Sequence, residues 1–430
     1  MAAIHKISAS TTTGINTLAD YDRWIIEAGV TVSGTADDAF FGYQRFVGNT
    51  FLVRGTVEAS GSYYAFLLRA DESRVSIEAG GHVTAERTAI WMRGDRSTVF
   101  NQGEIDATNF AIRFLGTRSH LSNEGAIASD NTAVYFGGLG GDARNSGTIS
   151  GVVGINANTL SGNAFALVNT GTIEGSKYAF VGSGSRQVVT NHGTISGDIY
   201  LRDSADAFIN SGGTLTGSVY GGHGNDEYTI DSAAISLVEL AGGGRDRVNS
   251  SVTYTLGDHF EALVLTGSAR INGTGNALAN DITGNSTGNR LAGLGGADIL
   301  HAGRGFDALF GGWGKDTLYG EAGNDRIFGG TGMDTLIGGT GSDILGGGGG
   351  ADTFVFARGD GADRIADFTA TGKDHDIIDL GKVTAIIGFW DLTRNHMVQS
   401  GSDVVITYPT GSITLENVDV ADLARADFIF

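Results

Sequence analysis

Short clusters of β-branched and aromatic residues alternate with glycine-containing turns along the first half of the chain. The phrase Asn-x-Gly-x-Ile recurs at Asn101, Asn123, Asn145, Asn169 and Asn191, in steps of 22, 22, 24 and 22 residues. Asn followed by Gly supplies the positive-φ positions of a turn, and the β-branched residue after it favours a strand. A second apolar cluster follows in most copies, with no helical period between them. This pattern predicts one rung of a parallel β-helix per phrase, with each Ile pointing inward.

Stacked rungs would place the asparagines of this phrase in a row, about 4.8 Å apart. Such a row could bind a ligand, or it could satisfy the backbone of its own turns. Asparagine side chains commonly hydrogen-bond to backbone groups in turns, so we expect the second use.

A sharper pattern begins at Gly284, where the chain divides into eight nonapeptides in phase up to Val355. Position eight is always apolar, which predicts a minimal strand, and position six is acidic in all but the first copy, which has Asn289. The aspartates at position six are Asp298, Asp307, Asp316, Asp325, Asp334, Asp343 and Asp352. A degenerate ninth copy with Asn280 precedes them, and isolated copies upstream contain Asp226 and Asp246.

Two nonapeptides suffice for one coil, because three residues around position eight form a strand and six glycine-rich residues form a turn. Alternate aspartates then stack on opposite edges, about one strand spacing apart. Bare carboxylates at this spacing would repel one another. A hard dication between successive turns removes the repulsion, and glycine lets turn carbonyls point inward where a Cβ would clash. All-oxygen coordination of this kind favours calcium over zinc.

Composition and charge narrow the possible partners. The 430 residues include 70 glycines, one proline and no cysteine, yet Ile, Val, Thr and Phe remain plentiful, so we expect an ordered β protein. A formal charge of −20 argues against nucleic acid and anionic membranes and favours cations. No run reaches transmembrane length, and the first residues lack the apolar region of an ordinary signal peptide. That suggests the cytosol, unless export is signalled elsewhere.

The motif G-G-x-G-x-D-x-U-x of the nonapeptides resembles the repeat of RTX (repeats-in-toxin) proteins, which is a calcium-binding signature. The resemblance implies a parallel β-roll with calcium between its turns, held by the stacked aspartates and by turn carbonyls. The carbonyls that the motif carries over include those of Gly312, Gly314, Gly330, Gly332, Gly339, Gly341, Gly348 and Gly350. Asn280, Asn289 and the replaced glycines at Leu294 and Glu321 depart from the pattern.

The C-terminal sequence is similar to that of RTX proteases of the serralysin type, in which the roll passes into a short β-sandwich. By analogy, Asp363 and Asp367 would close the last calcium site. The terminal Asp427-Phe428-Ile429-Phe430 resembles the uncleaved signal of type I secretion, which would account for the missing signal peptide. The resemblance covers residues 221–430, whereas the first half is similar only to β-helices in general.

The sequence therefore predicts an all-β protein. We expect an N-terminal segment or cap at 1–28, a parallel β-helix with about 22 residues per rung at 29–220, and an irregular RTX-like connection at 221–274. A calcium-bound β-roll follows at 275–355, and a small β-sandwich cap with the secretion signal at 356–430. In the first segment, Trp24, Ile25 and Ile26 could cover the open core, or the extended ISASTTTGI could pair with a neighbouring molecule.

No catalytic constellation accompanies these repeats. The histidines are scattered and form no H-E-x-x-H motif, and a lyase-like group on the β-helix would rest on Arg93, Asp95 and Arg113, which are close in rung register. We therefore expect a secreted, calcium-binding structural or adhesive protein of the cell surface or extracellular matrix, such as a surface-layer, filament or biofilm component, and no enzyme. The alternative is a polysaccharide-acting, lyase-like enzyme. Expected partners are the type I secretion machinery, further copies of the chain and a cell-surface polysaccharide, without nucleic acid or membrane insertion.

Overall fold

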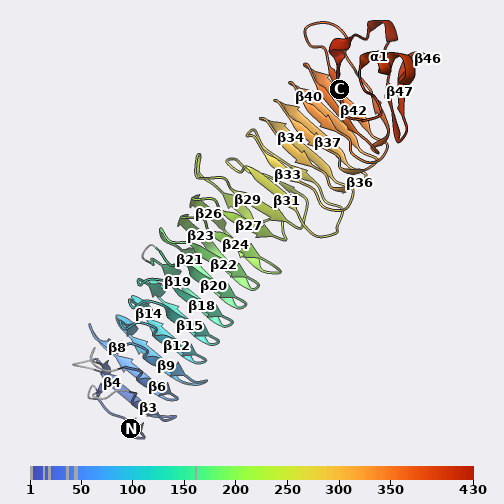
Figure 1. Cartoon of the computed structure of the whole chain (residues 1–430). Coiled ribbons are helices and arrows are strands. Elements are labelled where there is room, and N and C mark those ends of the chain that lie inside the picture. The colour runs from blue at the N-terminus through green and yellow to red at the C-terminus, as the bar shows by residue number, and fades with distance from the viewer. Residues whose placement is uncertain (1–2, 13–14, 18–20, 35–37, 43–46, 160–161) are drawn as a thin grey trace. The chain divides into compact units, whose positions relative to one another are not determined.

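Nearly all regular elements of the chain are short β-strands, and most pair in parallel with the equivalent strand of the next rung (Figure 1). The computed structural model describes residues 3–12, 15–17, 21–34, 38–42, 47–159 and 162–430. The chain comprises two units, residues 1–229 with 234–244, and residues 230–233 with 245–430. The predicted all-β solenoid is confirmed.

Three parallel ladders form the N-terminal unit, and a typical rung contributes one strand to each. The first ladder contains β1 (Ile4–Ile7), β3 (Arg23–Ile26), β6 (Thr50–Val53), β9 (Arg74–Ile77), β12 (Thr98–Asn101), β15 (Ser119–Asn123), β18 (Gly141–Asn145), β20 (Phe165–Asn169), β22 (Gln187–Asn191), β24 (Ala207–Asn210) and β27 (Glu227–Ile230). The second contains β4 (Thr31–Gly34), β7 (Thr56–Ala59), β10 (His82–Ala85), β13 (Glu104–Ala107), β16 (Ala126–Ser129) and β25 (Thr214–Thr216). The third contains β2 (Ile15–Thr17), β5 (Phe40–Gly42), β8 (Tyr64–Leu68), β11 (Thr88–Met92), β14 (Phe110–Phe114), β17 (Thr132–Phe136), β26 (Ser218–His223) and β28 (Ser236–Val238). The long strands β19 (Thr148–Ala157), β21 (Thr172–Val181) and β23 (Thr194–Asp203) serve both the second and the third ladder.

The core of this unit consists of like side chains stacked from rung to rung. The isoleucines of the repeated phrase follow one another in register in the second ladder and are buried, as predicted: Ile105, Ile127, Ile149, Ile173 and Ile195. Buried phenylalanines stack beside them, with ring centroids 4.8 Å apart between Phe114 and Phe136 and between Phe136 and Phe165.

The asparagines of the phrase form a buried ladder of side-chain hydrogen bonds. Asn101 Nδ2 donates to Asn123 Oδ1 at 2.8 Å, and Asn123 Nδ2 donates to Asn145 Oδ1 at 2.7 Å. The ladder continues through Asn169, Asn191 and Asn210. The same amide groups also donate to carbonyls of their own turns, such as Asn101 Nδ2 to Gly103 O at 3.2 Å. Because an amide is both donor and acceptor, the row satisfies itself and its turns, as expected.

The structure sets no boundary at residue 28. β1 pairs in parallel with β3 and β3 with β6, so these strands already belong to the first ladder. Ile25 and Ile26 are buried residues of β3 and do not fold over an open core. Within the stretch ISASTTTGI, residues 13–14 lie outside the described residues.

Two parallel ladders run through the C-terminal unit. One contains β29 (Arg247–Ser250), β31 (Ala262–Leu265), β33 (Asp281–Thr283), β35 (Ile299–His301), β38 (Thr317–Tyr319), β41 (Thr335–Ile337), β43 (Thr353–Ala357), β45 (Ile377–Lys382) and β49 (Phe428–Ile429). The other contains β30 (Tyr254–Thr255), β32 (Gly273–Thr274), β34 (Arg290–Gly295), β37 (Ala308–Trp313), β40 (Arg326–Thr331), β42 (Ile344–Gly349), β44 (Gly361–Ile365) and β48 (Gly411–Leu415). A minor pair joins β36 (Arg304–Gly305) to β39 (Ala322–Gly323).

Each coil of the roll contains two nonapeptides, as predicted. The register pairs Leu300 with Leu318 and Leu318 with Leu336 in one ladder, and Leu309 with Ile327 in the other. These position-eight side chains are buried between the two ladders. Pairing already starts at β29 and β31, so the roll is not set off at residue 275.

The C-terminal cap extends both ladders of the roll. β48 pairs in parallel with β44 and antiparallel with β47 (Asp403–Tyr408), which in turn pairs with β46 (Met397–Ser400). β49 pairs with β45 and buries Phe428, so the terminal tetrapeptide takes part in the folded cap. The remaining elements are the short α-helix α1 (Phe389–Asp391), the π-helix η1 (Leu392–His396) and the 3-10 helices η2 (Val420–Asp422) and η3 (Arg425–Asp427). Among the described residues, no helix has the length and hydrophobicity that a bilayer crossing requires.

Candidate metal-binding site

Two columns of buried aspartates run along the C-terminal unit. Most of these aspartates lie directly before a strand, so strand pairing fixes their place in the stack. The first column contains Asp298, Asp316, Asp334 and Asp352, and the second contains Asp307, Asp325, Asp343 and Asp363. The two columns correspond to the two edges that the phase of the nonapeptides predicts.

Each carboxylate in the columns is hydrogen-bonded through one oxygen only. The Asp298 amide donates to Asp316 Oδ1 at 2.8 Å, and the Asp316 amide donates to Asp334 Oδ1 at the same distance. The second column repeats this bond at 2.8 to 3.0 Å. In all eight aspartates the other oxygen, Oδ2, is buried and accepts no hydrogen bond from the described part of the chain.

Burial raises the pKa of these carboxyls, and the backbone hydrogen bonds only partly oppose it. The pKa rises to about 7 in Asp298, Asp325, Asp334 and Asp363, and to about 6 in Asp343. Repulsion from nearby acidic side chains adds to the rise. A buried charge without a partner is strongly unfavourable, so the folded columns require either protons or cations.

The turns hold the backbone in the left-handed region at positions two and four of the nonapeptide. Gly330 and Gly332 have φ of 115° and 143°, and the other predicted glycines share this conformation: Gly312, Gly314, Gly339, Gly341, Gly348 and Gly350. A Cβ at Gly332 would overlap the carbonyl oxygen of Gly314 in the coil before it. Glycine therefore allows the turn carbonyls to stack tightly.

Position one has a role that the predicted ligand list omits. A Cβ at Gly329 would overlap Asp334 Oδ2 of the same repeat, so this glycine leaves room beside the unpartnered oxygen. Position two is more tolerant, because Leu294 and Glu321 keep φ of 79° and 69°. These two departures from the motif therefore keep the turn in the left-handed region, at a smaller φ than the glycines have.

The donor set fits calcium. Unpartnered carboxylate oxygens and stacked turn carbonyls offer oxygen ligands alone, which hard dications such as Ca²⁺ prefer. The Oδ2 atoms of the two columns and the turn carbonyls would hold the ions. Bound calcium supplies the positive charge that these buried oxygens lack.

Amide side chains close the N-terminal ends of both columns. The Asn280 backbone donates to Asp298 Oδ1 at 2.7 Å. The Asn280 side chain donates to Phe260 O at 2.9 Å and accepts the Asn276 amide at 2.7 Å. Asn289 is arranged in the same way in the second column. Both asparagines are thus satisfied without an ion.

Asp376 closes the first column at its other end, and no motif reveals it. Its Oδ1 accepts the Asp352 amide at 2.9 Å, and its Oδ2 accepts the Thr369 amide at 2.8 Å. Asp376 lies outside the nonapeptide phase. The one feature that it shares with the other column aspartates is its position directly before a strand, β45.

The two aspartates predicted to close the last site have different surroundings. Asp363 is the last member of the second column and keeps an unpartnered Oδ2 within the described structure. Asp367 is exposed, and it accepts the amides of Gly347 and Gly348 at 2.9 and 3.0 Å. Asp367 therefore holds a turn of the roll through both of its oxygens.

Buried aspartates also precede strands outside the nonapeptide block. Asp226 precedes β27, and Asp246 precedes β29 and donates its amide to Glu261 Oε2 at 2.8 Å. Asp206, which the sequence motifs do not mark, precedes β24 and donates its amide to Asp226 Oδ1 at 2.7 Å. Burial raises the pKa of Asp206 to about 8. Its spacing of 20 residues from Asp226 is the signal that could have found it.

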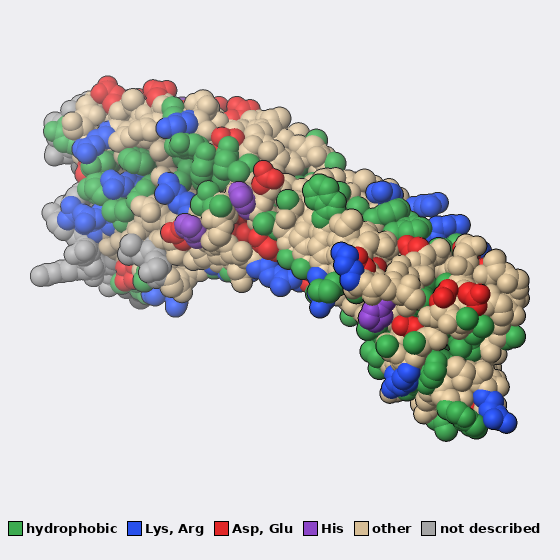
Figure 2. All heavy atoms as spheres, turned by 90° about the horizontal axis from the view of Figure 1, so that it is seen from above, with side chains coloured by type: hydrophobic (Ala, Val, Ile, Leu, Met, Phe, Trp, Pro, Cys, Tyr) green, Lys and Arg blue, Asp and Glu red, His purple; other side chains and the backbone are tan. Residues whose placement is uncertain are grey.

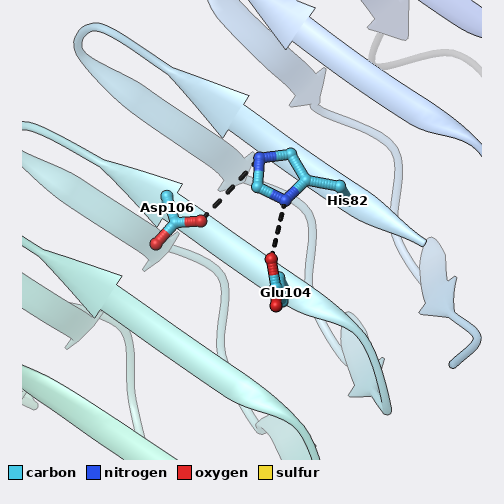
Figure 3. Close-up of side chains that lie close together, drawn as sticks. All are labelled: His82, Glu104 and Asp106. Carbon is cyan, nitrogen blue, oxygen red and sulfur yellow. Dashed lines mark hydrogen bonds and ion pairs between the residues drawn. The ribbon is translucent and has the colours of Figure 1, made fainter. Parts of the chain in front are cut away.

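A histidine and two carboxylates meet on the outer face of the N-terminal unit (Figure 3). His82 in β10 lies between Glu104 and Asp106 in β13, with its Nδ1 3.2 Å from Glu104 Oε2 and its Nε2 3.8 Å from Asp106 Oδ2. None of the three side chains is buried. We assign this group as an ion-pair cluster across two neighbouring rungs.

Of the three residues considered for a lyase-like site, the two arginines share an aromatic ring and the aspartate contacts the backbone of the next rung. Asp95 Oδ1 accepts the Thr117 amide at 2.7 Å and so supports the turn of the next rung. The guanidinium groups of Arg93 and Arg113 lie over the Trp91 ring, 5.3 and 4.9 Å from its centroid.

The calcium-free roll is expected to fold more readily as the pH falls. Several folded carboxyls have a pKa of about 7, above the roughly 3.9 of an unfolded aspartate. The folded, metal-free roll therefore binds more protons: it is most stable below about pH 4 and loses this stabilisation as the pH rises through about 7. The unfolded aspartates are already ionised at about pH 6, so folding on calcium displaces no proton, and the calcium-free roll should instead regain β structure as the pH falls from about 8 towards about 4. Circular dichroism in chelator across this pH range measures this, and a β content that does not rise at the acidic end would contradict it.

One family model matches the chain, described as "RTX calcium-binding nonapeptide repeat (4 copies)", at residues 274–309, 292–327 and 328–365. None of the curated proteins matches. Among solved structures, the extracellular lipase LipA from Serratia marcescens is 19% identical over 63% of this chain and 40% of the lipase, with a TM-score of 0.25. The AlgE6R3 subunit of the Azotobacter vinelandii mannuronan C5-epimerase is 25% identical over 36% of this chain and 79% of that one, with a TM-score of 0.16. The chain thus spans two fifths of the lipase. Residues 274–365 are RTX calcium-binding nonapeptide repeats within a β-solenoid.

Proposed function

We propose that this chain is a secreted, calcium-dependent structural or adhesive protein whose C-terminal unit folds on calcium outside the cell. The observation that carries this proposal is the pair of columns with eight buried, unpartnered carboxylate oxygens. Extracellular modules bind calcium at roughly 10⁻⁴–10⁻³ M, above the range of cytosolic sensors. The unit would therefore stay unfolded in the cytosol and remain fit for export by type I machinery, for which RTX repeats are typical substrates.

A non-enzymatic role is part of this proposal. Both units are built from repeated rungs, whose stacking forms extended surfaces. Asp95 is engaged by the backbone of the next rung, and Arg93 and Arg113 by an aromatic ring, so the residues of the lyase-like alternative have structural contacts. An extended surface suits adhesion or assembly.

Self-association in millimolar calcium is the expected behaviour. β1 pairs with β3, and its other edge pairs with no strand that the structure describes. Open strand edges pair with further chains, and calcium would reduce the repulsion between acidic molecules. Light scattering and electron microscopy of the full chain, in calcium and in chelator, measure assembly. The control is a chain that lacks residues 2–16. A monomer in both conditions, or equal assembly of the truncated chain, would contradict the N-terminal route.

A second candidate function, polysaccharide binding, is favoured by one stripe on the third ladder of the N-terminal unit. This aromatic–arginine stripe consists of Tyr64, Arg87, Trp91, Arg93, Phe110, Arg113 and Tyr135. Arg113 lies 4.9 to 5.5 Å from the centroids of three of these rings, and Arg87 lies 5.6 Å from that of Tyr64. Hydrophobic and basic side chains also lie side by side on the face of this unit that Figure 2 shows.

The stripe combines two features that suit an anionic glycan. Rigid aromatic rings pack against apolar faces of ligands, and guanidinium groups bind carboxylates through paired hydrogen bonds. Arg87, Arg93 and Arg113 form no ion pair with any described carboxylate, although the formal charge of the chain is −20. Charge complementarity therefore favours a polysaccharide that carries carboxylate groups.

Affinity electrophoresis with polygalacturonate tests this second candidate. The anionic polymer should retard the chain, neutral dextran should not, and Arg113→Ala should weaken the retardation several-fold. Arg144→Ala removes the same charge from an exposed position outside the stripe and should have little effect. Release of unsaturated sugar ends would identify a lyase instead, and absence of retardation would reject glycan binding.

A further inference from the structure

Two consecutive turns of the N-terminal unit repeat the backbone of the calcium-binding turns in the roll. They comprise residues 201–206 and 221–226, one rung apart, with β23 and β26 paired in parallel beside them. In the 221–226 turn, Gly222 and Gly224 have φ of 108° and 139°, within the range of the glycines at positions two and four of the roll.

The 201–206 turn adopts the same conformation without glycine. Arg202 and Ser204 occupy the equivalent positions and have φ of 85° and 91°. This left-handed conformation is unfavourable for a residue that carries a side chain. The roll contains the same kind of substitution at Leu294 and Glu321, where the turn persists within the calcium-binding stack.

Carbonyl oxygens stack between these two turns as they do in the roll. A Cβ at Gly222 would overlap the carbonyl oxygen of Arg202, and a Cβ at Gly224 would overlap that of Ser204. The equivalent carbonyls in the roll are those that the nonapeptide motif assigns to calcium. Backbone oxygens are therefore gathered here in the same way.

Asp206 completes the correspondence with the roll. Its Oδ1 accepts the Gln187 amide at 2.6 Å, and its own amide donates to Asp226 Oδ1 at 2.7 Å. Asp206 is only 2% exposed, and its Oδ2 accepts no hydrogen bond from any residue that the structure describes. One rung earlier, the Gln187 side-chain amide donates to Ser185 O at 2.5 Å, and its Oε1 is buried and accepts no hydrogen bond from any described residue.

A third carboxylate approaches the 221–226 turn. Glu239 is buried, and it accepts the Gly222 amide at 3.2 Å and the Tyr228 hydroxyl. One carboxylate oxygen of Glu239 lies within 4.8 Å of a carboxylate oxygen of Asp226. Two carboxylates at this separation favour a cation close to both.

We infer that the 201–206 and 221–226 turns hold a calcium ion within the N-terminal unit. Asp206 Oδ2, the carboxylates of Asp226 and Glu239, and the turn carbonyls would hold it. The repeat motif marks only the Asp226 half of this site, because Arg202 and Ser204 replace its glycines in the other turn and the family match begins only at residue 274. Calcium then stabilises the last rungs of the β-helix as well as the roll, wherever the protein acts.

The calcium stoichiometry of the full chain tests this inference. Asp206→Asn keeps an oxygen for the Gln187 amide but removes the anionic oxygen, so the variant should fold and bind one calcium ion fewer in equilibrium dialysis. Asp203→Asn removes the same charge from an exposed side chain of the same loop and should retain the full number. Equal stoichiometry of Asp206→Asn and the unaltered chain would overturn the site.

Hydrogen exchange of peptides from residues 187–229 gives a second readout. Calcium should slow exchange there in the unaltered chain, and Asp206→Asn should abolish this effect while the roll still responds. Ser204→Gly relieves the unfavourable φ, so it should lower the calcium concentration that gives half-maximal slowing, and this result does not depend on how well Asp206→Asn folds. Slowing that neither substitution changes would show that protection merely spreads from the roll, and the site would be wrong.

Discussion

Removal of calcium is expected to unfold the C-terminal unit and to leave most of the N-terminal unit folded. Eight buried Oδ2 atoms would lose their cations. An unpaired buried charge costs several kcal/mol, and a typical domain is stable by only about 5–15 kcal/mol. Glycine-rich turns add a further entropic cost of ordering. The asparagine ladder of the N-terminal unit needs no ion, because its amides satisfy one another.

Far-UV circular dichroism and limited proteolysis of the full chain measure this effect in millimolar calcium and in chelator. In chelator, proteases should digest residues 245–430 and leave a fragment from the N-terminal unit. Magnesium is the matched control, because it demands octahedral geometry and gives up its water reluctantly, so it should not restore the unit. Equal β content and equal cleavage in calcium and in chelator would refute the dependence.

Gly350→Ala is expected to raise the calcium midpoint of folding at least about tenfold, whereas Gly349→Ala should leave it nearly unchanged. Gly350 has φ of 133°, and a Cβ there would overlap the carbonyl oxygen of Gly332. The left-handed conformation alone costs alanine roughly 1–2 kcal/mol, before the overlap is counted. At Gly349 a Cβ meets no atom within 4 Å, and φ is not positive.

The two glycines are neighbours in one repeat, so composition, length and charge are identical in the two variants. Calcium titrations followed by circular dichroism compare their midpoints directly. Alanine at Gly349 also restricts the unfolded chain, so a slight stabilisation is expected there. If both variants shift the midpoint equally, the stacked-carbonyl explanation of position four is incorrect.

The columns of the roll were predictable because a nine-residue phase carries both the aspartate and the apolar residue after it. Asp298 to Asp352 fall on this phase, and strand pairing then brings every second one into the same column. The nine-residue phase does not predict Asp206 and Asp376, although the structure places both in columns. The turn before Asp206 uses Arg202 and Ser204 where the motif has glycine, and Asp376 follows Asp352 after a longer coil of 24 residues. The backbone conformation of the turn determines which aspartates join a column, and the glycine motif marks only some of these turns in the sequence.

The ends of the repeat regions were less predictable than their register. β1 and β3 pair in the first ladder although residues 1–28 contain no Asn-x-Gly-x-Ile phrase. β29 and β31 likewise pair with Val248 opposite Leu263, although only one isolated copy of the nonapeptide, with Asp246, marks β29 in the sequence. Parallel pairing needs only a short strand with an inward apolar residue, which many sequences supply. Turn motifs in the sequence therefore predict the regular rungs, whereas rungs without such a motif cannot be predicted in this way.

The hydrogen bonds of the aspartate columns all point the same way along the chain. Each amide donates to the carboxylate of the following coil, as Asp316 does to Asp334, so a coil is complete only when its successor is in place. The last members are anchored differently: Asp363 lies in β44 against β48, and Asp376 is held by Thr369. In a stack where each repeat contacts only its neighbours, this polarity favours growth from the cap backwards. The roll would then assemble in the direction opposite to that of its synthesis.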